Sequence, residues 1–303
     1  MSAKACLVIG DINIDFAIHS KAYPPEGGEA HAEQADFRLG GSGCLSAIAL
    51  QRLGCPTMLA GNVGNDVFAD FAMQHIRAAG LDSALIQRLA GQQTGFFMIL
   101  VTPGGQRTMF GNRGANAVPM PEEMLIPTLP ACRHLHLSGY SLLGEDQYEM
   151  VRAFVPQARQ AGLSISLDPG VCTSSQARQK LLDLLPLVDF FLPSLDELRI
   201  LTGVEQPDAQ IAAILALGCK SLALKMGALG SRFVDGSLDI HQPAIHDDTR
   251  PVLDTTGAGD CFNAGFLHGM LSGAAVEEAL LAGNQAAFRM ITSPHGILDL
   301  IAS

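Results

Sequence analysis

The sequence predicts an α/β fold, in which a mainly parallel central sheet is covered by helices on both faces. Short apolar segments of β-like composition alternate with longer segments of helical character along most of the chain, and this alternation is typical of a parallel sheet. With 303 residues, of which 48% are hydrophobic, the chain can bury a substantial core. Glycines that favour helix termination follow several of the helical segments, at Gly54, Gly80, Gly162, Gly203 and Gly218.

The expected elements follow from these patterns in chain order. The expected strands are residues 5–10, 57–61, 134–138, 164–167, 189–192 and 221–225. The expected helices are residues 43–53, 66–79, 145–161, 173–185, 194–202, 209–217, 257–271 and 276–291. Two segments, 15–39 and 93–111, break the alternation, and the second has an apolar run at 96–101 before the turn Pro103-Gly104-Gly105. This pattern predicts a β-hairpin, which could form part of a small separate sheet or an edge of the main sheet.

Charge and cysteine content narrow the classes of function. A net charge of -11 without a Lys/Arg run argues against nucleic acid or an anionic membrane surface as the main partner. The seven cysteines are an odd number and form no C-x-x-C pair, which indicates free thiols in a reducing compartment. The sequence has no apolar run of membrane-spanning length, and its first residues lack the basic region followed by a long apolar stretch that is typical of a secretory leader. We therefore expect a soluble cytoplasmic protein.

The segment Asp254-Thr255-Thr256-Gly257-Ala258-Gly259-Asp260 carries the strongest functional signal. It places small residues and an acid where a loop turns into an apolar helix. Gly257, Ala258 and Gly259 can bring backbone N–H groups close to an anion, and the helix adds the positive end of its dipole. A carboxylate at Asp260 beside a bound phosphoryl group would suit a base that accepts the proton of an attacking hydroxyl. The alternative is a glycine-rich turn with an ordinary first-turn acid.

Two further segments suggest a site for a polyhydroxylated molecule. Asp11, Asn13 and Asp15 follow the first strand, where alternation would place them on one side and carboxylates could accept hydrogen bonds from hydroxyls. Asp11 and Asn13 could equally be loop residues that cap backbone amides. Gly40 and Gly41 precede the helix at 43–53 and would allow close backbone approach to a ligand.

These segments together resemble the ribokinase-like family of carbohydrate kinases, also called the PfkB family. The resemblance extends from Val8–Asp15 through Gly40–Gly43, Gly105–Thr108, Leu192–Gly203 and Lys225–Ser231 to the signature at residues 254–265. It implies a single three-layer α/β/α domain over residues 1–303, with a small β-sheet lid formed by about 15–39 and 93–113. In the family such a lid covers the sugar and often pairs two subunits, which implies a homodimer.

The resemblance also implies roles for individual residues. Asp260 would be the catalytic base, and the amides of Gly257, Ala258 and Gly259 would hold the transferring phosphoryl group. The implied sugar contacts are Asp15, Asn13, Gly40, Gly41 and Asn112. The implied nucleotide contacts are Ser194, Lys225, Gly227, Gly230 and Asn284. The implied cofactors are ATP and Mg2+. The resemblance leaves open whether a monovalent cation such as K+ is also needed.

The sequence departs from the family pattern at three positions. Leu45 replaces a common asparagine, and Ser42 stands where ribokinases proper have lysine. Both changes remove polar sugar contacts and leave the acceptor open. Ser194 replaces the asparagine of an Asn-x-x-Glu motif and Glu197 is retained, so Glu197 could orient Mg2+-bound water or could simply complete a helix capping box with Ser194.

Other polar residues have less specific interpretations. His134 and His136 share one face of a strand, as metal ligands sometimes do, but the sequence identifies no third ligand, and partly buried strand histidines are the preferred interpretation. Arg107, Asn112 and Arg113 could reach a substrate from the lid or could lie at the surface.

The sequence thus predicts an ATP-dependent kinase that transfers the γ-phosphoryl group to a hydroxyl of a sugar or sugar-like molecule, with Asp260 as base. A nucleoside kinase of the same fold and a non-catalytic sugar-binding protein are the alternatives. An NAD-dependent oxidoreductase would need the acid-bearing strand context that neither Gly41-Ser42-Gly43 nor Gly257-Ala258-Gly259 has. The absence of Gly-Lys-Ser/Thr excludes a P-loop ATPase.

Overall fold

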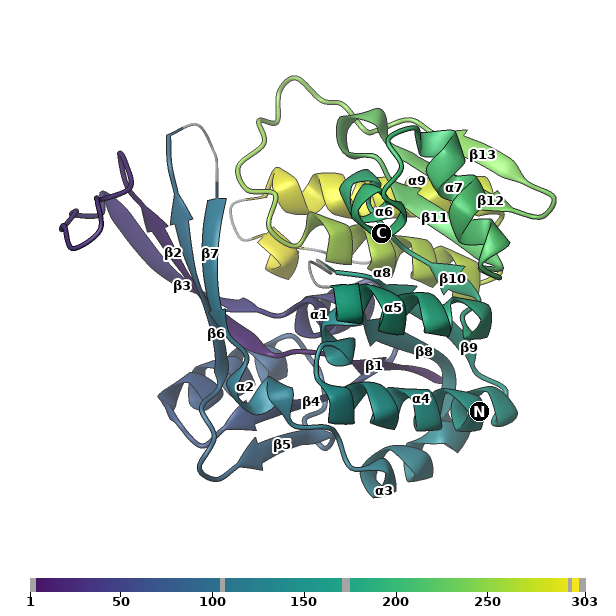
Figure 1. Ribbon diagram of the computed structural model, residues 1–303, viewed down its shortest axis with the longest axis horizontal. Coiled ribbons are helices and arrows are strands. Elements are labelled where there is room, and N and C mark those ends of the chain that lie inside the picture. The colour runs from purple at the N-terminus through teal and green to yellow at the C-terminus, as the bar shows by residue number, and fades with distance from the viewer. Residues whose placement is uncertain (1–3, 104–106, 171–174, 294–295, 300–303) are drawn as a thin grey trace.

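The computed structural model describes residues 4–103, 107–170, 175–293 and 296–299, and its ribbon has two unequal parts (Figure 1). Gly104 and Gly105 of the expected turn, Cys172 and the first two residues of the helix expected at 173–185 lie outside these ranges. Within the described ranges, no helix combines the length and the apolar character needed to cross a membrane.

The larger part is built on a nine-stranded sheet in the order β13-β12-β11-β10-β9-β8-β1-β4-β5. Neighbours from β11 to β5 are parallel, whereas β12 and β13 add antiparallel strands at one edge. The strands are β1 (Ala5–Ile9), β4 (Thr57–Gly64), β5 (Ile86–Leu89), β8 (Cys132–Ser138), β9 (Ser164–Asp168), β10 (Phe190–Phe191), β11 (Ser221–Lys225), β12 (Ser231–Asp235) and β13 (Asp239–Gln242).

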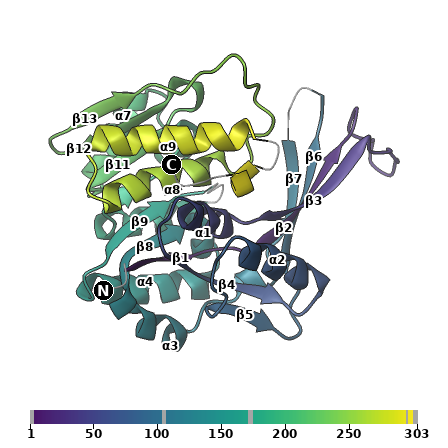
Figure 2. The ribbon, with the colours of Figure 1, turned by 180° about the vertical axis from the view of Figure 1, so that it is seen from behind.

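Helices cover both faces of this sheet, as the alternation predicted. One face carries α3 (Glu122–Leu125), α4 (Glu145–Gln160), α5 (Ser175–Leu184), α6 (Leu195–Thr202) and α7 (Pro207–Ala216). The other carries α1 (Ser42–Arg52), α2 (Val67–Ala78), α8 (Ala258–Leu271) and α9 (Val276–Ile291), which come to the front in the reverse view (Figure 2). Side chains of β1 alternate between the two cores, with Leu7 and Ile9 in the first and Cys6 and Val8 in the second. The three-layer α/β/α prediction is therefore confirmed.

The smaller part is a separate four-stranded sheet in the order β3-β2-β6-β7. Its strands are β2 (Asn13–His19), β3 (Gln34–Gly40), β6 (Gly95–Val101) and β7 (Arg107–Asn112). The predicted hairpin is the antiparallel pair β6 and β7, and β2 pairs with β6 in parallel. An edge of the main sheet was thus the wrong alternative for this hairpin. In both views the sheet projects away from the main body (Figures 1 and 2).

Close glycine contacts join the end of β1 to the start of α1, and α8 to α9. A β-carbon at Gly10 would come within 2.6 Å of the Gly43 Cα atom, so only glycine lets the start of α1 approach the end of β1 this closely. A β-carbon at Gly269 would come within 2.8 Å of the Ala279 Cα atom, which shows how closely α8 and α9 pack. Hydrogen bonds from Ser42 and Ser46 of α1 to Asp260 of α8 place the first turns of these two helices side by side.

Candidate active site

The signature segment forms a tight turn that leads into α8. The Asp254 Oδ1 atom accepts hydrogen bonds from the Thr256 amide and hydroxyl, both at 2.8 Å. Gly257 then adopts a left-handed conformation with φ 85° and caps the helix, a conformation that costs energy for any residue with a β-carbon. Asp260 consequently lies in the first turn of α8, where the helix dipole favours negative charge.

The Asp260 carboxylate is partly exposed and is held by two hydroxyl groups of α1. Its Oδ1 atom accepts hydrogen bonds from Ser42 Oγ at 2.7 Å and from Ser46 Oγ at 3.1 Å. Burial and the charge of Asp168 raise the pKa of Asp260, the hydrogen bond from Ser42 lowers it, and the resulting pKa is about 7. A carboxylate whose pKa lies near neutral pH is suited to accept a proton during a reaction.

A buried ion pair lies next to this carboxylate. Lys225 Nζ donates to Asp168 Oδ2 at 2.7 Å, and the Asn263 amide donates to the same oxygen. Burial raises the pKa of Asp168, but its pairing with Lys225 outweighs burial and leaves the pKa below its usual value. A β-carbon at Gly259 would lie 3.5 Å from Lys225 Nζ, so the ammonium group is adjacent to the signature turn. It therefore places positive charge where the turn would bind an anion.

Ser194 and Glu197 form the capping box that the sequence allowed. Ser194 Oγ accepts from the Glu197 amide at 3.2 Å, and Glu197 Oε2 accepts from the Ser194 amide at 2.6 Å. Burial raises the pKa of Glu197, whereas the nearby Lys225 lowers it. Among the described residues, no cluster of three or more His, Cys, Asp or Glu side chains is arranged to hold a metal ion.

The small sheet contributes a second carboxylate, that of Asp15. It is buried on β2, and a β-carbon at Gly40 would overlap its oxygens, which explains why position 40 must be glycine. Gly41, with φ 93°, turns the chain from β3 into α1. Burial raises the pKa of Asp15 to about 6, while the Arg38 guanidinium lowers it.

Arg38 also links the small sheet to the signature turn. Arg38 faces Asp15 across the antiparallel pair β2 and β3, and its guanidinium forms ion pairs with Asp36 and with Asp254. The small sheet is thereby tied to the turn that precedes Asp260.

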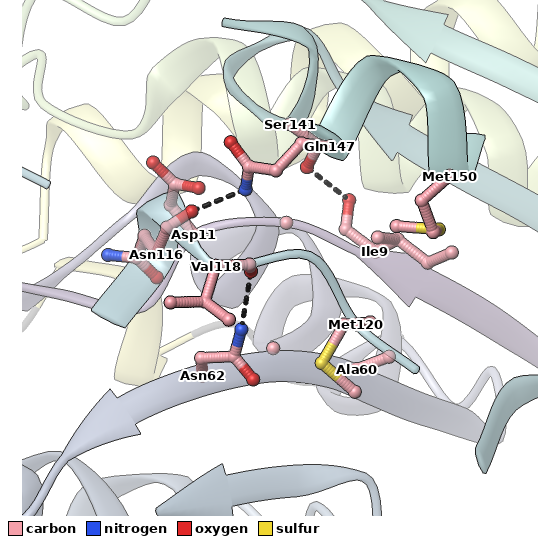
Figure 3. A pocket seen from close by; sticks show the side chains of 12 residues that line it. Ile9, Asp11, Ala60, Asn62, Asn116, Val118, Met120, Ser141, Gln147 and Met150 are labelled. Carbon is pink, nitrogen blue, oxygen red and sulfur yellow. Dashed lines mark hydrogen bonds between the residues drawn. The ribbon is translucent and has the colours of Figure 1, made fainter. Parts of the chain in front are cut away.

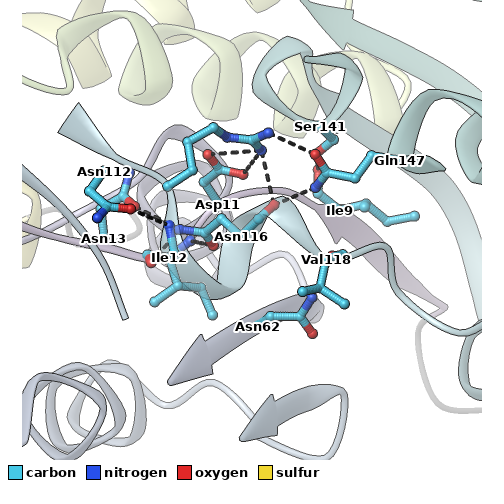
Figure 4. Close-up of polar contacts among 12 residues, drawn as sticks. Ile9, Asp11, Ile12, Asn13, Asn62, Asn112, Asn116, Val118, Ser141 and Gln147 are labelled. Atoms are coloured by element: carbon cyan, nitrogen blue, oxygen red, sulfur yellow. Dashed lines mark hydrogen bonds and ion pairs between the residues drawn. The ribbon is translucent and has the colours of Figure 1, made fainter. Parts of the chain in front are cut away.

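Asp11 and Asn13 have different partners from those expected. The Asp11 carboxylate accepts from Arg113 Nη2 at 3.0 Å, so it neither caps backbone amides nor lies free at the sheet edge, and Arg113 is not a surface arginine. Asn13 Oδ1 accepts from the Asn116 amide at 2.7 Å. Asn112 is exposed, and its Oδ1 atom accepts from the Gly114 amide at 2.9 Å. Figure 4 shows the side chains of Asp11, Asn13 and Asn116 among these polar contacts.

A small pocket of about 20 Å³ lies behind this network (Figure 3). It is lined by Asp11, Asn62, Asn116, Ser141 and Gln147 together with apolar side chains and the backbone of β1 and β4. Its volume is about that of one water molecule, and Asp260 does not line it. We therefore assign it to the packing of the sheet edge rather than to the binding of an acceptor.

The expected nucleotide residues lie around the ends of β11 and β13. Gly227 and Gly230 both have positive φ, of 58° and 94°, in the turn between β11 and β12. The Asn284 amide group donates to the carbonyls of Gln242 and Pro243 at 3.2 and 3.0 Å, so it joins α9 to the end of β13.

The two strand histidines are buried structural residues. His134 and His136 have no exposed surface and contact Ser164 and Ser166 through hydrogen bonds of 2.7 to 2.8 Å. Burial lowers their pKa values to about 3 and about 4. They are thus more buried than the sequence suggested.

The structure brings Asp260, Gly259 and Lys225 together, and Glu197 lies close enough to Lys225 for their charges to interact. Sequence reasoning missed the contacts of Ser42 and Ser46 with Asp260, although their spacing of four residues places them on one face of the expected helix. It also missed Asp168 and Asn263. The only signal for these was an acid at the end of an expected strand and an asparagine three residues after Asp260.

Comparison with known proteins relates this chain to carbohydrate kinases. Residues 3–301 match the pfkB family carbohydrate kinase pattern. A ribokinase of Arabidopsis thaliana is 29% identical over 287 residues, which cover 92% of this chain and 73% of the plant protein. A 2-dehydro-3-deoxygluconokinase of Bacillus subtilis (strain 168) is 29% identical over 283 residues, which cover 90% and 86% of the two chains. The structure of Arabidopsis thaliana ribokinase complexed with ribose and ATP matches with a TM-score of 0.86, at 26% identity and over 99% and 96% of the chains.

The two sheets and the glycine turn at the start of α8 define a ribokinase-like protein. The chain belongs to the pfkB family of carbohydrate kinases. The prediction of a sugar kinase, an ATP-dependent phosphotransferase, is confirmed at the level of this family.

Proposed function

We propose that this kinase transfers the γ-phosphoryl group of ATP to a hydroxyl of a sugar or sugar-like molecule, with Asp260 as the catalytic base. The observation that supports this most directly is the position of the Asp260 carboxylate. It lies in the first turn of α8, beside the left-handed Gly257, with a pKa of about 7. The acceptor hydroxyl would give its proton to Asp260 as its oxygen attacks the phosphorus atom and ADP leaves.

The phosphoryl group would be stabilised by the turn and by Lys225. The amides of Gly257 and Gly259 and the positive end of α8 would face the transferring group, whereas the Ala258 amide also contacts the Thr255 carbonyl at 3.2 Å. The ammonium group of Lys225 beside Gly259 would offset negative charge as it develops. Gly227, Gly230, Ser194 and Asn284 would border the nucleotide.

The acceptor would bind between the two sheets. Asp15 would accept hydrogen bonds from its hydroxyls, and Gly40, Gly41, Asn13 and Asn112 would border the site. We propose that the small sheet, from segments 15–39 and 93–113, is a lid inserted in a single domain over residues 1–303. The link between Arg38 and Asp254 supports this role, because it joins the lid to the signature turn.

The residues around Glu197 suit Mg2+ held mainly by phosphates and water. A single half-buried carboxylate beside a lysine is no complete metal cage, which fits the preference of Mg2+ for keeping several waters. When bound, Mg2+ would neutralise phosphate charge, and Glu197 would orient its waters. A role for K+ stays a prediction.

Glu197→Gln separates the metal role from the capping role. Glutamine can still accept from the Ser194 amide, so the capping box and the melting temperature should be kept, while the charge is lost. We expect a several-fold higher Mg2+ concentration for half-maximal activity at fixed ATP. If the Mg2+ titration coincides with that of the wild type, Glu197 only caps α6.

A screen of ADP release tests the proposed reaction and identifies the acceptor. Pentoses, hexoses, ketoses, sugar acids and nucleosides would each be added to enzyme, ATP and Mg2+. We expect at least one to raise ADP release about 10²-fold or more over ATP alone. Release with nucleosides alone would favour the nucleoside kinase alternative, and no release with any acceptor would favour a sugar-binding protein.

Leu45 packs against the signature turn. Its Cδ1 atom lies 3.3 Å from the position that a β-carbon at Gly257 would take, so the apolar side chain at position 45 supports the conformation of the turn.

We also propose a homodimer formed through the lid. Met98 and Phe110 are paired across β6 and β7 and are 45% and 62% exposed, and they line an apolar hollow of about 220 Å³ with Tyr23. An exposed apolar surface of this kind is typical of an association site, and a second copy would cover it. A monomer in sedimentation velocity at micromolar concentration would contradict this.

The six described cysteines are all free and buried, which supports a cytoplasmic location.

A further inference from the structure

The first turns of α1 hold one oxygen of Asp260 and leave the other open. Ser42 and Ser46 are four residues apart, so their hydroxyls lie on the same face of α1 and both donate to Oδ1, at 2.7 and 3.1 Å. Among the described residues, no group donates a hydrogen bond to Oδ2. The close approach of Gly10 and Gly43 fixes the start of α1 and therefore the position of Ser42.

This asymmetry gives the two oxygens of the carboxylate different roles. A carboxylate whose one oxygen accepts two hydrogen bonds cannot rotate freely, because rotation would break both. The other oxygen is then directed at a fixed point, and a base must lie within hydrogen-bonding reach of the proton that it accepts. The hydrogen bonds from the two hydroxyls stabilise the ionised carboxylate more than the protonated carboxyl group, so they favour the ionised form of Asp260.

Charged groups around the carboxylate do not supply this orientation. Asp168 of β9 repels it, and Lys225 of β11, which attracts it, is hydrogen-bonded to Asp168 instead. The charge of Asp260 also raises the pKa values of the buried thiols of Cys44 on α1 and Cys261 on α8. The serines are therefore the hydrogen-bond donors that hold Asp260 in place.

We propose that Ser42 and Ser46 are positioning residues, which clamp Oδ1 of Asp260 so that Oδ2 receives the proton of the acceptor hydroxyl. This inference rests on the proposed role of Asp260 as the base. It assigns a function to Ser42, the position at which the sequence departs from ribokinases proper. It also explains why a hydroxyl suits this position, because an ammonium group bound to Asp260 would make it a weaker base.

The pH dependence of kcat tests the proposal. Ser42→Ala, Ser46→Ala and the double variant would be compared with the wild type between about pH 5.5 and 9.5. Loss of donors to the ionised carboxylate raises its pKa, so the acidic limb of the profile should move to higher pH, by about one unit in the double variant. We expect kcat at pH 7 to fall about tenfold and to recover partly at high pH, with the KM for ATP unchanged.

Two controls make the result specific. Ser42→Thr keeps the hydroxyl and should restore the wild-type profile. Ser221→Ala removes another buried serine hydroxyl, which donates to the Asp189 carbonyl at 2.6 Å at the far end of β11, and should leave the profile unchanged.

The outcomes separate this proposal from the proposed function. If Asp260→Asn is inactive but the serine variants keep the wild-type pH profile, the positioning role is wrong and the base assignment stands. A higher KM for the acceptor with an unshifted profile would make the serines binding residues and would also overturn the proposal. If Asp260→Asn is as active as the wild type, the base assignment itself fails.

Discussion

Replacement of Asp260 by asparagine is expected to lower kcat by about 10² or more while the protein still folds and binds ATP. Asparagine has the shape of aspartate, and its Oδ1 atom can still accept from Ser42 and Ser46. Its amide nitrogen, however, cannot take up the proton of the acceptor hydroxyl. Steady-state ADP release at saturating acceptor measures the loss. Asp208→Asn is a matched control, because Asp208 also lies in the first turn of a helix but on α7.

The same substitution is expected to keep or to increase the stability of the folded protein. Burial and the charge of Asp168 raise the pKa of Asp260 from 3.8 to about 7, so the ionised form disfavours the folded state at neutral pH. The neutral amide removes this cost, and the melting temperature at pH 8 should stay constant or rise. For the wild type, the same pKa predicts that kcat falls as the pH drops through about 7. Near-wild-type turnover by Asp260→Asn would contradict the assignment.

The layered architecture could be predicted because short β-like segments alternate with longer helical segments along the chain. A parallel strand buried on both faces, such as β1, leaves little room for polar residues, and its boundaries are visible in the sequence. The strands that were missed are β5, β12 and β13 at the sheet edges. Their sequences, such as Ile-Gln-Arg-Leu in β5, mix charged and apolar residues because one side faces solvent.

The signature turn could also be predicted, because its chemistry depends on local backbone conformation. Gly257 needs positive φ, and Asp260 needs a place in the first turn of the helix, and both are properties of neighbouring residues. The contacts that complete the site join distant segments. Ser42 and Asp260 are separated by 218 positions, and Arg38 and Asp254 by 216. A single sequence contains no information on which distant polar groups pair, so these contacts became visible only in the folded chain.

The same reason explains the error at Asp11. Alternation along an extended chain predicted that Asp11, Asn13 and Asp15 would lie on one side, but β1 ends at Ile9 and β2 begins at Asn13. Asp11 therefore lies between two different sheets, where Arg113 binds it, while Asp15 is carried by the small sheet. The break between the strands, rather than the residue types, gives the two carboxylates different surroundings.

Replacement of Asp15 by alanine is expected to raise the KM for the acceptor by about tenfold or more and to leave the KM for ATP almost unchanged. The methyl group cannot accept hydrogen bonds from the acceptor's hydroxyls. Arg38 would keep its ion pairs with Asp36 and Asp254, so the link between the sheets should persist. Initial rates at varied acceptor and saturating ATP, and the reverse, measure the two constants.

The pH dependence of the acceptor KM distinguishes a binding role of Asp15 from a purely structural role. Burial raises the pKa of this carboxyl from 3.8 to about 6, so it is mainly charged at pH 7 and becomes protonated as the pH falls through about 6. The acceptor KM of the wild type should therefore increase below about pH 6, and that increase should be absent in Asp15→Ala. Asp36→Ala, on the same face of the small sheet, controls for disturbance of Arg38. An equal loss of affinity for ATP and acceptor in Asp15→Ala would instead make Asp15 a structural residue of the small sheet.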